Sequence, residues 1–273
     1  MEPNQKLVVV DIGCRWGFAE KFIDEKGAFH AYGFDPDIEE CQRLSKRYAS
    51  SNVSLIPLGL AGIPGKRTLY ITQEPACSSL LQPDPELTEN YPALQCARHV
   101  STVEVETTTL DHWALRDGVH VVDYIKVDTQ GTELEILRGG INTLKNVRCL
   151  EVEVEFNPIY LGQPVFADVD MFLREQGFVL WKLTNHVHYS RDGAPMEPLG
   201  EDAIFYDDKQ RVAHPLFGGQ LYWANAHYVR KSVLSAKDVS AIQMQRDISL
   251  FTTLGMPDVV SHLNARVDAV CKQ

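Results

Sequence analysis

The chain has 273 residues, of which 44% are hydrophobic and 23% charged, the proportions of an ordinary globular protein. Its formal net charge of -11 argues against nucleic acid or an anionic membrane as the main partner, because both need a basic face. No stretch resembles a signal peptide or a membrane span, so we expect a cytoplasmic protein that acts on a small molecule. The six cysteines form no C-x-x-C pair, which indicates reduced thiols and no zinc site.

Strand and helix signals alternate along the chain, which is typical of a parallel sheet covered by helices. Strands are expected at residues 7–11, 30–35, 53–57, 67–72, 102–108, 121–128, 147–156, 178–184 and, as a late edge strand, 202–206. Helices are expected at residues 18–26, 37–49, 131–140 or 131–144, 167–176, 235–253 and 257–270. A long loop rich in Pro, Ser and Glu is expected at about residues 73–98.

This pattern predicts an α/β fold with a doubly wound, mostly parallel, Rossmann-like sheet over residues 1–230. Residues 231–273 change character, and we expect them to form a C-terminal helical extension. The extension is interpreted as a helical pair that covers substrate or forms the contact of a homo-oligomer.

The first predicted strand ends in the sequence DIGCRWG, which has an acid at Asp11 and glycines at Gly13 and Gly17. Glycine allows a tight turn and a close approach to a ligand, and a following helix start would offer free N–H groups. An acid here suits a cofactor with a positive group, such as S-adenosylmethionine, better than the pyrophosphate of NAD. The glycines also lack the G-x-G-x-x-G spacing of a dinucleotide turn. Close strand-to-helix packing is the alternative role of both glycines, and Arg15 stands where such turns often carry Gly or Asn.

Acids end the expected strands at residues 7–11, 30–35 and 121–128, namely Asp11, Asp35 and Asp128. The last of these is counted as the fourth strand of the parallel sheet. Residues at these carboxyl ends converge in doubly wound sheets. Asp35 follows the glycine turn by about 20 residues, the spacing of an acid that binds ribose hydroxyls. Asp37 is interpreted as a helix cap.

The chain resembles the FkbM-type S-adenosylmethionine-dependent methyltransferases over roughly residues 8–156. The resemblance rests on DIGCRWG at 11–17, FDPD at 34–37, TTTLD at 107–111 and VDYIKVDTQGTELEILRGG at 122–140, where Gln130 replaces the usual Glu. It implies a class I methyltransferase sheet of seven strands with the last antiparallel, and methyl transfer to a hydroxyl of a sugar, glycan or small natural product. An NAD-linked oxidoreductase and a non-catalytic binding module are the alternatives.

The resemblance also implies a set of cofactor contacts. Asp11, Gly13 and Gly17 would line the methionine end, Asp35 the ribose, and Leu60 and Ala61 the adenine, with Asp128 near the reacting centre. The full set of expected cofactor-binding residues is Asp11, Gly13, Cys14, Arg15, Gly17, Asp35, Pro36, Leu60, Ala61, Asp128 and Gln130.

An alcohol acceptor must lose a proton, so a general base is needed within hydrogen-bond reach. Asp128 is the first choice. Glu153 and Glu155 come next, because strand alternation puts them on one side of a strand that should neighbour Asp128. His186 is a further candidate, since it follows a predicted strand and could lie over the substrate. These carboxylates are hard metal ligands, but the sequence lacks a tight ligand motif, and we expect no metal.

Overall fold

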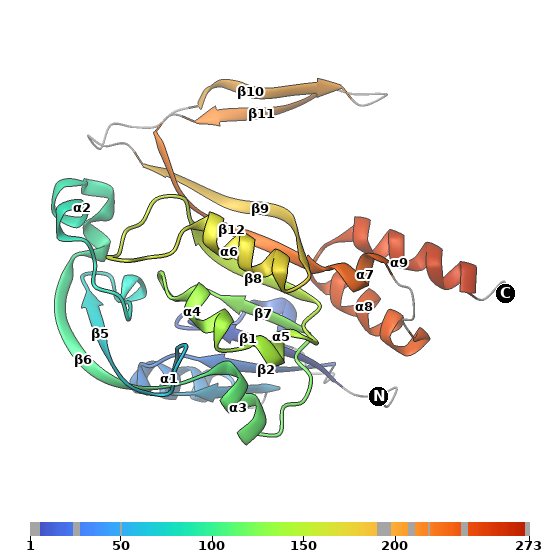
Figure 1. Cartoon of the computed structure of the whole chain (residues 1–273), viewed down its shortest axis with the longest axis horizontal. Coiled ribbons are helices and arrows are strands. Elements are labelled where there is room, and N and C mark those ends of the chain that lie inside the picture. Colours follow the sequence, from blue (N-terminus) through green and yellow to red (C-terminus); the bar gives the residue numbers. More distant parts are fainter. Residues whose placement is uncertain are drawn as a thin grey trace.

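The computed structural model describes residues 6–23, 28–49, 51–189, 198–206, 211–217, 219–235 and 240–270. The expected α/β architecture is confirmed: a seven-stranded sheet has the order β3-β2-β1-β7-β8-β12-β9 and is flanked by helices (Figure 1). Its strands are β1 Leu7–Ile12, β2 Phe29–Phe34, β3 Val53–Ile56, β7 Tyr124–Val127, β8 Cys149–Glu155, β9 Phe178–Tyr189 and β12 Gln220–Arg230. The last of these strands, β12, is antiparallel to both of its neighbours, as the family resemblance implied.

Strand order reverses between β1 and β7, which pair in parallel although β2 and β3 extend to the other side of β1. Such a reversal opens a crevice outside the carboxyl ends of the strands. The residues that follow β1, β2 and β7 therefore converge at the carboxyl ends of the strands. We call this side of the sheet the carboxyl edge.

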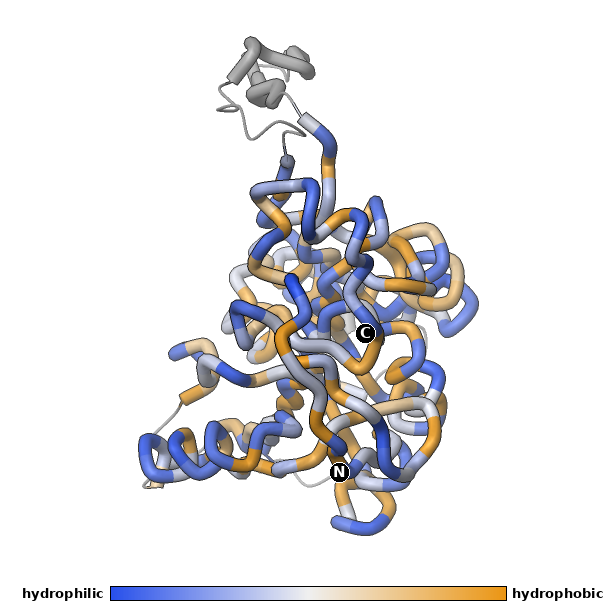
Figure 2. Tube along the Cα trace, turned by 90° about the vertical axis from the view of Figure 1, so that its left-hand side faces the viewer, coloured by the Kyte–Doolittle hydropathy of each residue, from blue (hydrophilic) through white to orange (hydrophobic). Residues whose placement is uncertain are grey.

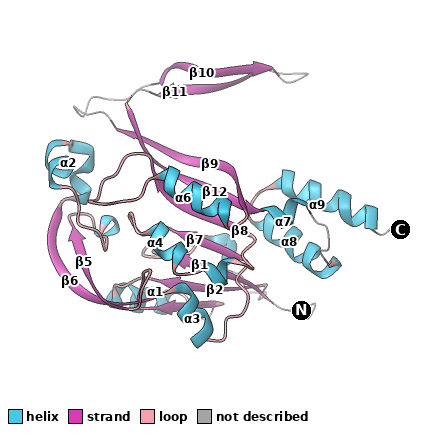
Figure 3. Ribbon diagram, viewed as in Figure 1, coloured by secondary structure: helices cyan, strands magenta, loops and turns pink. Residues whose placement is uncertain are grey.

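Helices cover both faces of the sheet (Figure 3). One face packs against buried side chains of α3 Leu110–Arg116, α4 Glu133–Arg138, α5 Ile141–Leu144 and α6 Phe166–Glu175. The other face packs against α1 Ile38–Arg47, α7 Lys231–Ser235, α8 Ala241–Thr253 and α9 Pro257–Val270. Hydrophobic and hydrophilic residues alternate along much of the outer chain trace, as expected of elements with one buried face (Figure 2).

A smaller three-stranded sheet lies beside the carboxyl edge of the main sheet (Figure 1). It consists of β4 Gly59–Leu60, β5 Gly65–Thr72 and β6 His99–Thr108. The intervening residues form the short helices η2 Pro75–Cys77, α2 Pro85–Asn90 and η3 Pro92–Ala97, so the expected long loop is wrong. Each begins with a proline in its first turn, where the missing N–H costs nothing. We call residues 73–98 the cap segment.

The expected helix over residues 18–26 is wrong for its described part, which contains only the short 3-10 helix η1 Glu20–Phe22. Phe18 and Phe22 are buried with the spacing of a helical face, but Gly17 has a φ of 97° and Ala19 is extended. Residues 24–26 lie outside the described part of the chain.

Two late elements also differ from expectation. The expected edge strand lies within β10 Pro198–Tyr206, which pairs with β11 Arg211–Phe217 in a separate two-stranded sheet. The expected helix start at Ser235 is the end of α7, and α8 begins after Ser240, whose side chain accepts a hydrogen bond from Gln243 N.

The C-terminal helices pack at the amino ends of the strands, which we call the amino edge of the sheet. Arg246 of α8 contacts Asp123, which directly precedes β7, and Asp247 contacts Arg148, which precedes β8. The expected role of these helices in covering substrate is therefore wrong, because they lie opposite the carboxyl edge. A homo-oligomer contact through them and a domain boundary at residue 230 stay predictions. None of the described helices has the length and apolar character needed to cross a membrane.

Candidate active site

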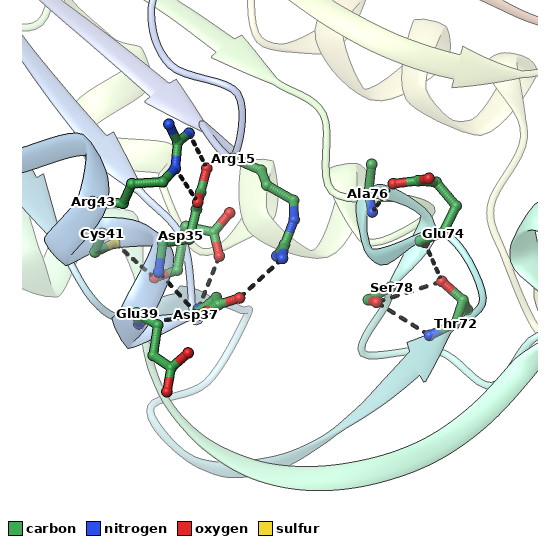
Figure 4. A network of polar contacts seen from close by, with 11 residues as sticks. Arg15, Asp35, Asp37, Glu39, Cys41, Arg43, Thr72, Glu74, Ala76 and Ser78 are labelled. Atoms are coloured by element: carbon green, nitrogen blue, oxygen red, sulfur yellow. Dashed lines mark hydrogen bonds and ion pairs between the residues drawn. The ribbon is translucent and has the colours of Figure 1, made fainter. Parts of the chain in front are cut away.

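A cavity of about 620 Å³ lies at the carboxyl edge, between the main sheet and the three-stranded sheet. Its wall combines the turns that follow β1, β2, β3 and β7 with the inner face of β5 and β6 and with η2. Figure 4 shows two sides of the opening, with Asp35 and Asp37 on one side and Ala76 and Ser78 on the other. The expected site residues in this wall are Gly13, Arg15, Asp35, Pro36, Leu60, Asp128 and Gln130.

Gly13 brings the turn after β1 into contact with the turn after β7. Its φ is 85°, and a Cβ built at this position would lie 1.9 Å from the carbonyl oxygen of Asp128. No side chain fits there, so glycine is needed for the two turns to meet. This close approach forms the floor of the cavity.

Gly17 serves packing, the alternative that its sequence pattern left open. A Cβ at Gly17 would lie 2.4 Å from the hydroxyl oxygen of Tyr48, which also accepts a hydrogen bond from Phe18 N at 3.1 Å. Cys14 and Ala61 are likewise buried, with 2% and 0% exposure, and lie outside the cavity wall.

Asp11 lies near the end of β1, outside the cavity wall but directly before Ile12 and Gly13, which line it. Its Oδ1 atom is buried without a hydrogen-bond partner, although Lys126 Nζ is 3.9 Å away. Burial raises the pKa of Asp11 to about 6, and the Lys126 charge opposes this rise. A buried carboxylate oxygen in this state is costly unless a ligand completes its interactions.

Asp35 ends β2 at the rim, and its Oδ1 accepts a hydrogen bond from Asp37 N at 2.8 Å. Burial raises the pKa of Asp35 to about 6. Asp37 caps α1, as expected, by accepting from Glu39 N and Glu40 N. Arg15 extends to Asp37, where Nη2 and Oδ2 are 3.0 Å apart (Figure 4). The guanidinium is therefore held at the wall by an ion pair.

Asp128 is the acidic centre of a hydrogen-bonded group at the end of β7. Lys126 Nζ donates to its Oδ2 at 3.0 Å, and Gln130 Nε2 lies 3.3 Å from its Oδ1. Burial opposes ionisation, but the Lys126 charge and the hydrogen bonds hold the pKa of Asp128 below its usual range. Burial and the Asp128 charge raise the pKa of Glu153 well above its usual range. At neutral pH Asp128 is therefore the carboxylate, and Glu153 keeps a proton and is hydrogen-bonded to it.

Gln130 links this pair to the cap segment. Its Nε2 donates to Glu153 at 2.7 Å, and its Oε1 accepts from the Tyr160 hydroxyl at 3.1 Å. Its carbonyl accepts from Ser79 Oγ at 2.7 Å, and its φ of 60° is rare for a residue with a side chain. A glutamate here would add a negative charge beside Asp128 and Glu153, whereas the amide donates to both. Sequence reasoning missed Tyr160 and Ser79 as partners, because they are distant in the chain.

Glu155 and His186 lie outside the cavity wall. Glu155 is 3% exposed, and burial, with the charge of Glu133, raises its pKa well above the usual range. Glu133 itself accepts from Thr129 N and Gly131 N and so shapes the turn after β7. His186 is exposed on β9. Among the residues that the structure describes, no group of three or more His, Cys, Asp or Glu side chains is arranged to hold a metal ion.

The sequence profile of the methyltransferase FkbM domain family matches residues 11–180, which is more than half of the chain. This range contains the turns after β1, β2 and β7 that build the cavity. The chain belongs to the methyltransferase FkbM domain family.

Individual proteins resemble the chain more distantly. A curated 2-O-methyltransferase, NoeI of Sinorhizobium fredii, is 26% identical over 174 residues, which cover 60% of this chain and 70% of that protein. The crystal structure of methyltransferase FkbM from Methylobacillus flagellatus is 13% identical, with a TM-score of 0.42, and the match covers 82% of this chain and 43% of that one. The magnesium protoporphyrin IX methyltransferase of Synechocystis, solved with bound SAM, is 14% identical over 82% of this chain and 70% of its own, with a TM-score of 0.38.

Proposed function

We propose that the chain is an S-adenosylmethionine-dependent methyltransferase that acts on a hydroxyl group of a sugar, glycan or small natural product. The observation that carries the proposal is the Oδ1 atom of Asp11, which is buried near the end of β1, directly before the cavity-lining residues Ile12 and Gly13, and has no hydrogen-bond partner. An ammonium group is the natural complement of such an oxygen. S-adenosylmethionine carries one, and membership of a methyltransferase family favours this cofactor over NAD.

Further residues of the cavity fit the same cofactor. Gly13 lines the cavity, so the turn after β1 presents backbone to a ligand there. Asp35 is 5% exposed at the rim and would accept hydrogen bonds from the ribose hydroxyls. Apolar side chains, including Leu58, Leu60 and Leu69, line the region where a flat adenine ring would be held.

The cofactor, when bound, supplies an activated methyl group on a positively charged sulfur. The protein must orient the acceptor hydroxyl and take up its proton. Asp128 is ionised and lines the cavity, so we assign it the role of general base. Lys126 and Gln130 hold its carboxylate in place. Glu153 holds a proton behind it and thereby shares the charge that the base carries.

A hydroxyl acceptor is supported by the similarity to NoeI, a 2-O-methyltransferase. The Asp128 carboxylate in the cavity wall also suits an acceptor with several hydroxyl groups, because carboxylate oxygens accept hydrogen bonds from hydroxyls. We therefore favour a sugar or glycan over an apolar natural product.

The proposal is tested by calorimetry with S-adenosylhomocysteine on the full chain. We expect binding by the natural protein and a loss of affinity of about tenfold or more in Asp35→Asn, because charge-assisted hydrogen bonds to the ribose are lost. Asp168→Asn is the matched control: Asp168 is an exposed aspartate at the start of α6 that accepts from Val165 N. Its affinity should stay within about twofold of the natural protein's. A natural protein that gives no binding heat would contradict the assignment.

A further inference from the structure

Two half-buried cysteines, Cys77 and Cys96, lie side by side in the cap segment. Each thiol shifts the pKa of the other, and the Cys96 Sγ atom also lies 3.7 Å from the carbonyl oxygen of Ala93. Backbone hydrogen bonds hold the same two stretches together: Glu74 N donates to the carbonyl of Cys96, and Gln73 N to the carbonyl of Arg98, both at 2.9 Å. The sulfur pair is therefore built into the packing of η2 against η3.

This pair differs from the other described cysteines in accessibility and acidity. Cys14, Cys41 and Cys149 are at most 3% exposed, and burial raises their pKa values. The interaction with the Cys77 thiol lowers the pKa of Cys96 to about 7, whereas the same interaction, together with burial, raises the pKa of Cys77. Cys96 is the thiolate of the pair and hence the nucleophile.

The pair is attached to the wall of the cavity. The residues around Cys77 that line the cavity are Pro75, Ala76, Ser78 and Leu80. The carbonyl of Cys77 accepts a hydrogen bond from the Tyr160 hydroxyl at 2.6 Å, and that hydroxyl also contacts Gln130. Gln130 in turn contacts Asp128. A displacement of Cys77 would therefore be transmitted to the acidic centre of the site.

We propose that Cys77 and Cys96 form a reversible disulfide that serves as a redox-responsive lock on this wall of the cavity. The oxidant is a hydroperoxide, with hydrogen peroxide as the simplest case. The Cys96 thiolate attacks one peroxide oxygen and displaces the other as hydroxide, which takes up a proton and leaves as water. The resulting sulfenic acid is attacked by the sulfur of Cys77, the S–S bond forms, and the hydroxyl leaves with the thiol proton as a second water. In total, the two thiols lose two electrons, and one peroxide molecule accepts them.

The lock is expected to weaken cofactor binding. A disulfide bond of about 2.05 Å is shorter than any non-bonded contact between two thiols. Its formation draws η2 toward η3 and away from the cavity. This consequence rests on the proposed function, whereas the disulfide itself does not.

The disulfide is tested on the full chain by treating the reduced protein with hydrogen peroxide, alkylating the remaining thiols and mapping the peptides by mass spectrometry. We expect one major cross-linked peptide that contains Cys77 and Cys96 and that dithiothreitol reverses. In Cys77→Ser, Cys96 should accumulate as a sulfenic acid trapped by dimedone. In Cys96→Ser, oxidation of Cys77 should be at least about tenfold slower, because burial still raises the pKa of Cys77 when the Cys96 thiol is gone. Absence of the cross-link, or equal oxidation rates in both variants, would overturn the proposal.

The lock is tested by calorimetry with S-adenosylhomocysteine on reduced and oxidised protein. We expect an affinity about threefold or more weaker after oxidation, and no effect of peroxide on the double variant Cys77→Ser/Cys96→Ser. Unchanged affinity in the cross-linked protein would overturn the lock. Failure of the reduced protein to bind would instead contradict the proposed function, and the peptide map would still decide whether the disulfide forms.

Discussion

Buried charges at the amino ends of the strands of the main sheet have different partners from those at the carboxyl ends. At the amino edge, Asp123 lies 2.9 Å from Arg246, and Arg148 lies 2.6 Å from Asp247. At the carboxyl edge, Asp11 has a buried oxygen without a hydrogen-bond partner. Helix α8 thus pairs each buried acid at the amino edge with an arginine, whereas at the carboxyl edge Lys126 hydrogen-bonds to Asp128 and leaves an oxygen of Asp11 for a ligand to complete. The proposed site is therefore distinguished by a buried carboxylate oxygen without a hydrogen-bond partner, because acids occur at both ends of the strands.

The largest effect is expected at the amino edge. Arg246→Met leaves Asp123 buried without its cation and should lower the free energy of unfolding by about 3–5 kcal/mol. Urea denaturation measures this loss. The double variant Arg246→Met/Asp123→Asn should recover a large part of it, because no charge is then buried alone. A single variant as stable as the natural protein would remove the contrast between the edges.

Asp128→Asn tests the charge at the carboxyl edge. We expect kcat for methyl transfer to fall about 10²-fold or more, since the base is lost, while affinity for S-adenosylhomocysteine changes less than about threefold. Glu153→Gln is the matched control: it keeps a hydrogen-bond donor behind Asp128, so its loss should be smaller. Equal losses of affinity and turnover in Asp128→Asn would make Asp128 a binding residue.

The pH dependence follows from Asp11 and Asp35, whose pKa values are both raised to about 6 by burial. A raised pKa means that the folded protein holds a proton that the unfolded chain has released. Stability of the free protein should therefore fall as pH rises from about 4 to 6. The cofactor should bind the ionised carboxylates, so affinity should fall about fivefold for each linked proton between pH 6 and pH 5.

Calorimetry with S-adenosylhomocysteine in buffers of different ionisation enthalpy measures this linkage directly. The natural protein should release protons on binding near pH 6, and Asp35→Asn should release fewer. Binding that is independent of pH between 5 and 7 would show that neither carboxyl group contacts the ligand.

The smallest effect is expected for Arg15. Its ion pair with Asp37 is partly exposed, with 23% and 33% of the two side chains accessible, so Arg15→Ala should cost at most about 1 kcal/mol of stability. Affinity for S-adenosylhomocysteine should change less than about threefold, because the guanidinium is held at the wall. A marked gain in affinity would instead mean that Arg15 competes with the ligand for the cavity.

Short-range features could be predicted from sequence. The cap at Asp37 needs only backbone N–H groups two and three residues further on, and the structure confirms it. The first and last residues of strands and helices depend on contacts with residues far away in the sequence, so they were harder to predict. Strand β7 begins only at Tyr124, three residues after the expected start, and the carboxylate of the preceding Asp123 accepts from Val8 N and pairs with Arg246. Strand β9 extends to Tyr189, beyond the expected end at residue 184, because it pairs with β12 over this length.

Within the site, sequence alone indicated the acids at the strand ends and the need for glycine at position 13, since both follow from strand polarity and turn chemistry. It could not show that Gly17 and Cys14 pack in the interior, that His186 is exposed, or that Gln130 joins Asp128 to Glu153.

The sequence by itself therefore determined most strands of the main sheet, the family and the candidate residues, because these depend on periodicity and on motifs of neighbouring residues, but it missed β12 and α3. Only the tertiary structure decided which carboxyl groups are ionised, which are compensated and which line the cavity. The physical reason is that a pKa and a hydrogen bond depend on distances across the sheet. Those distances are set by the joint packing of segments as far apart as Asp123 and Arg246.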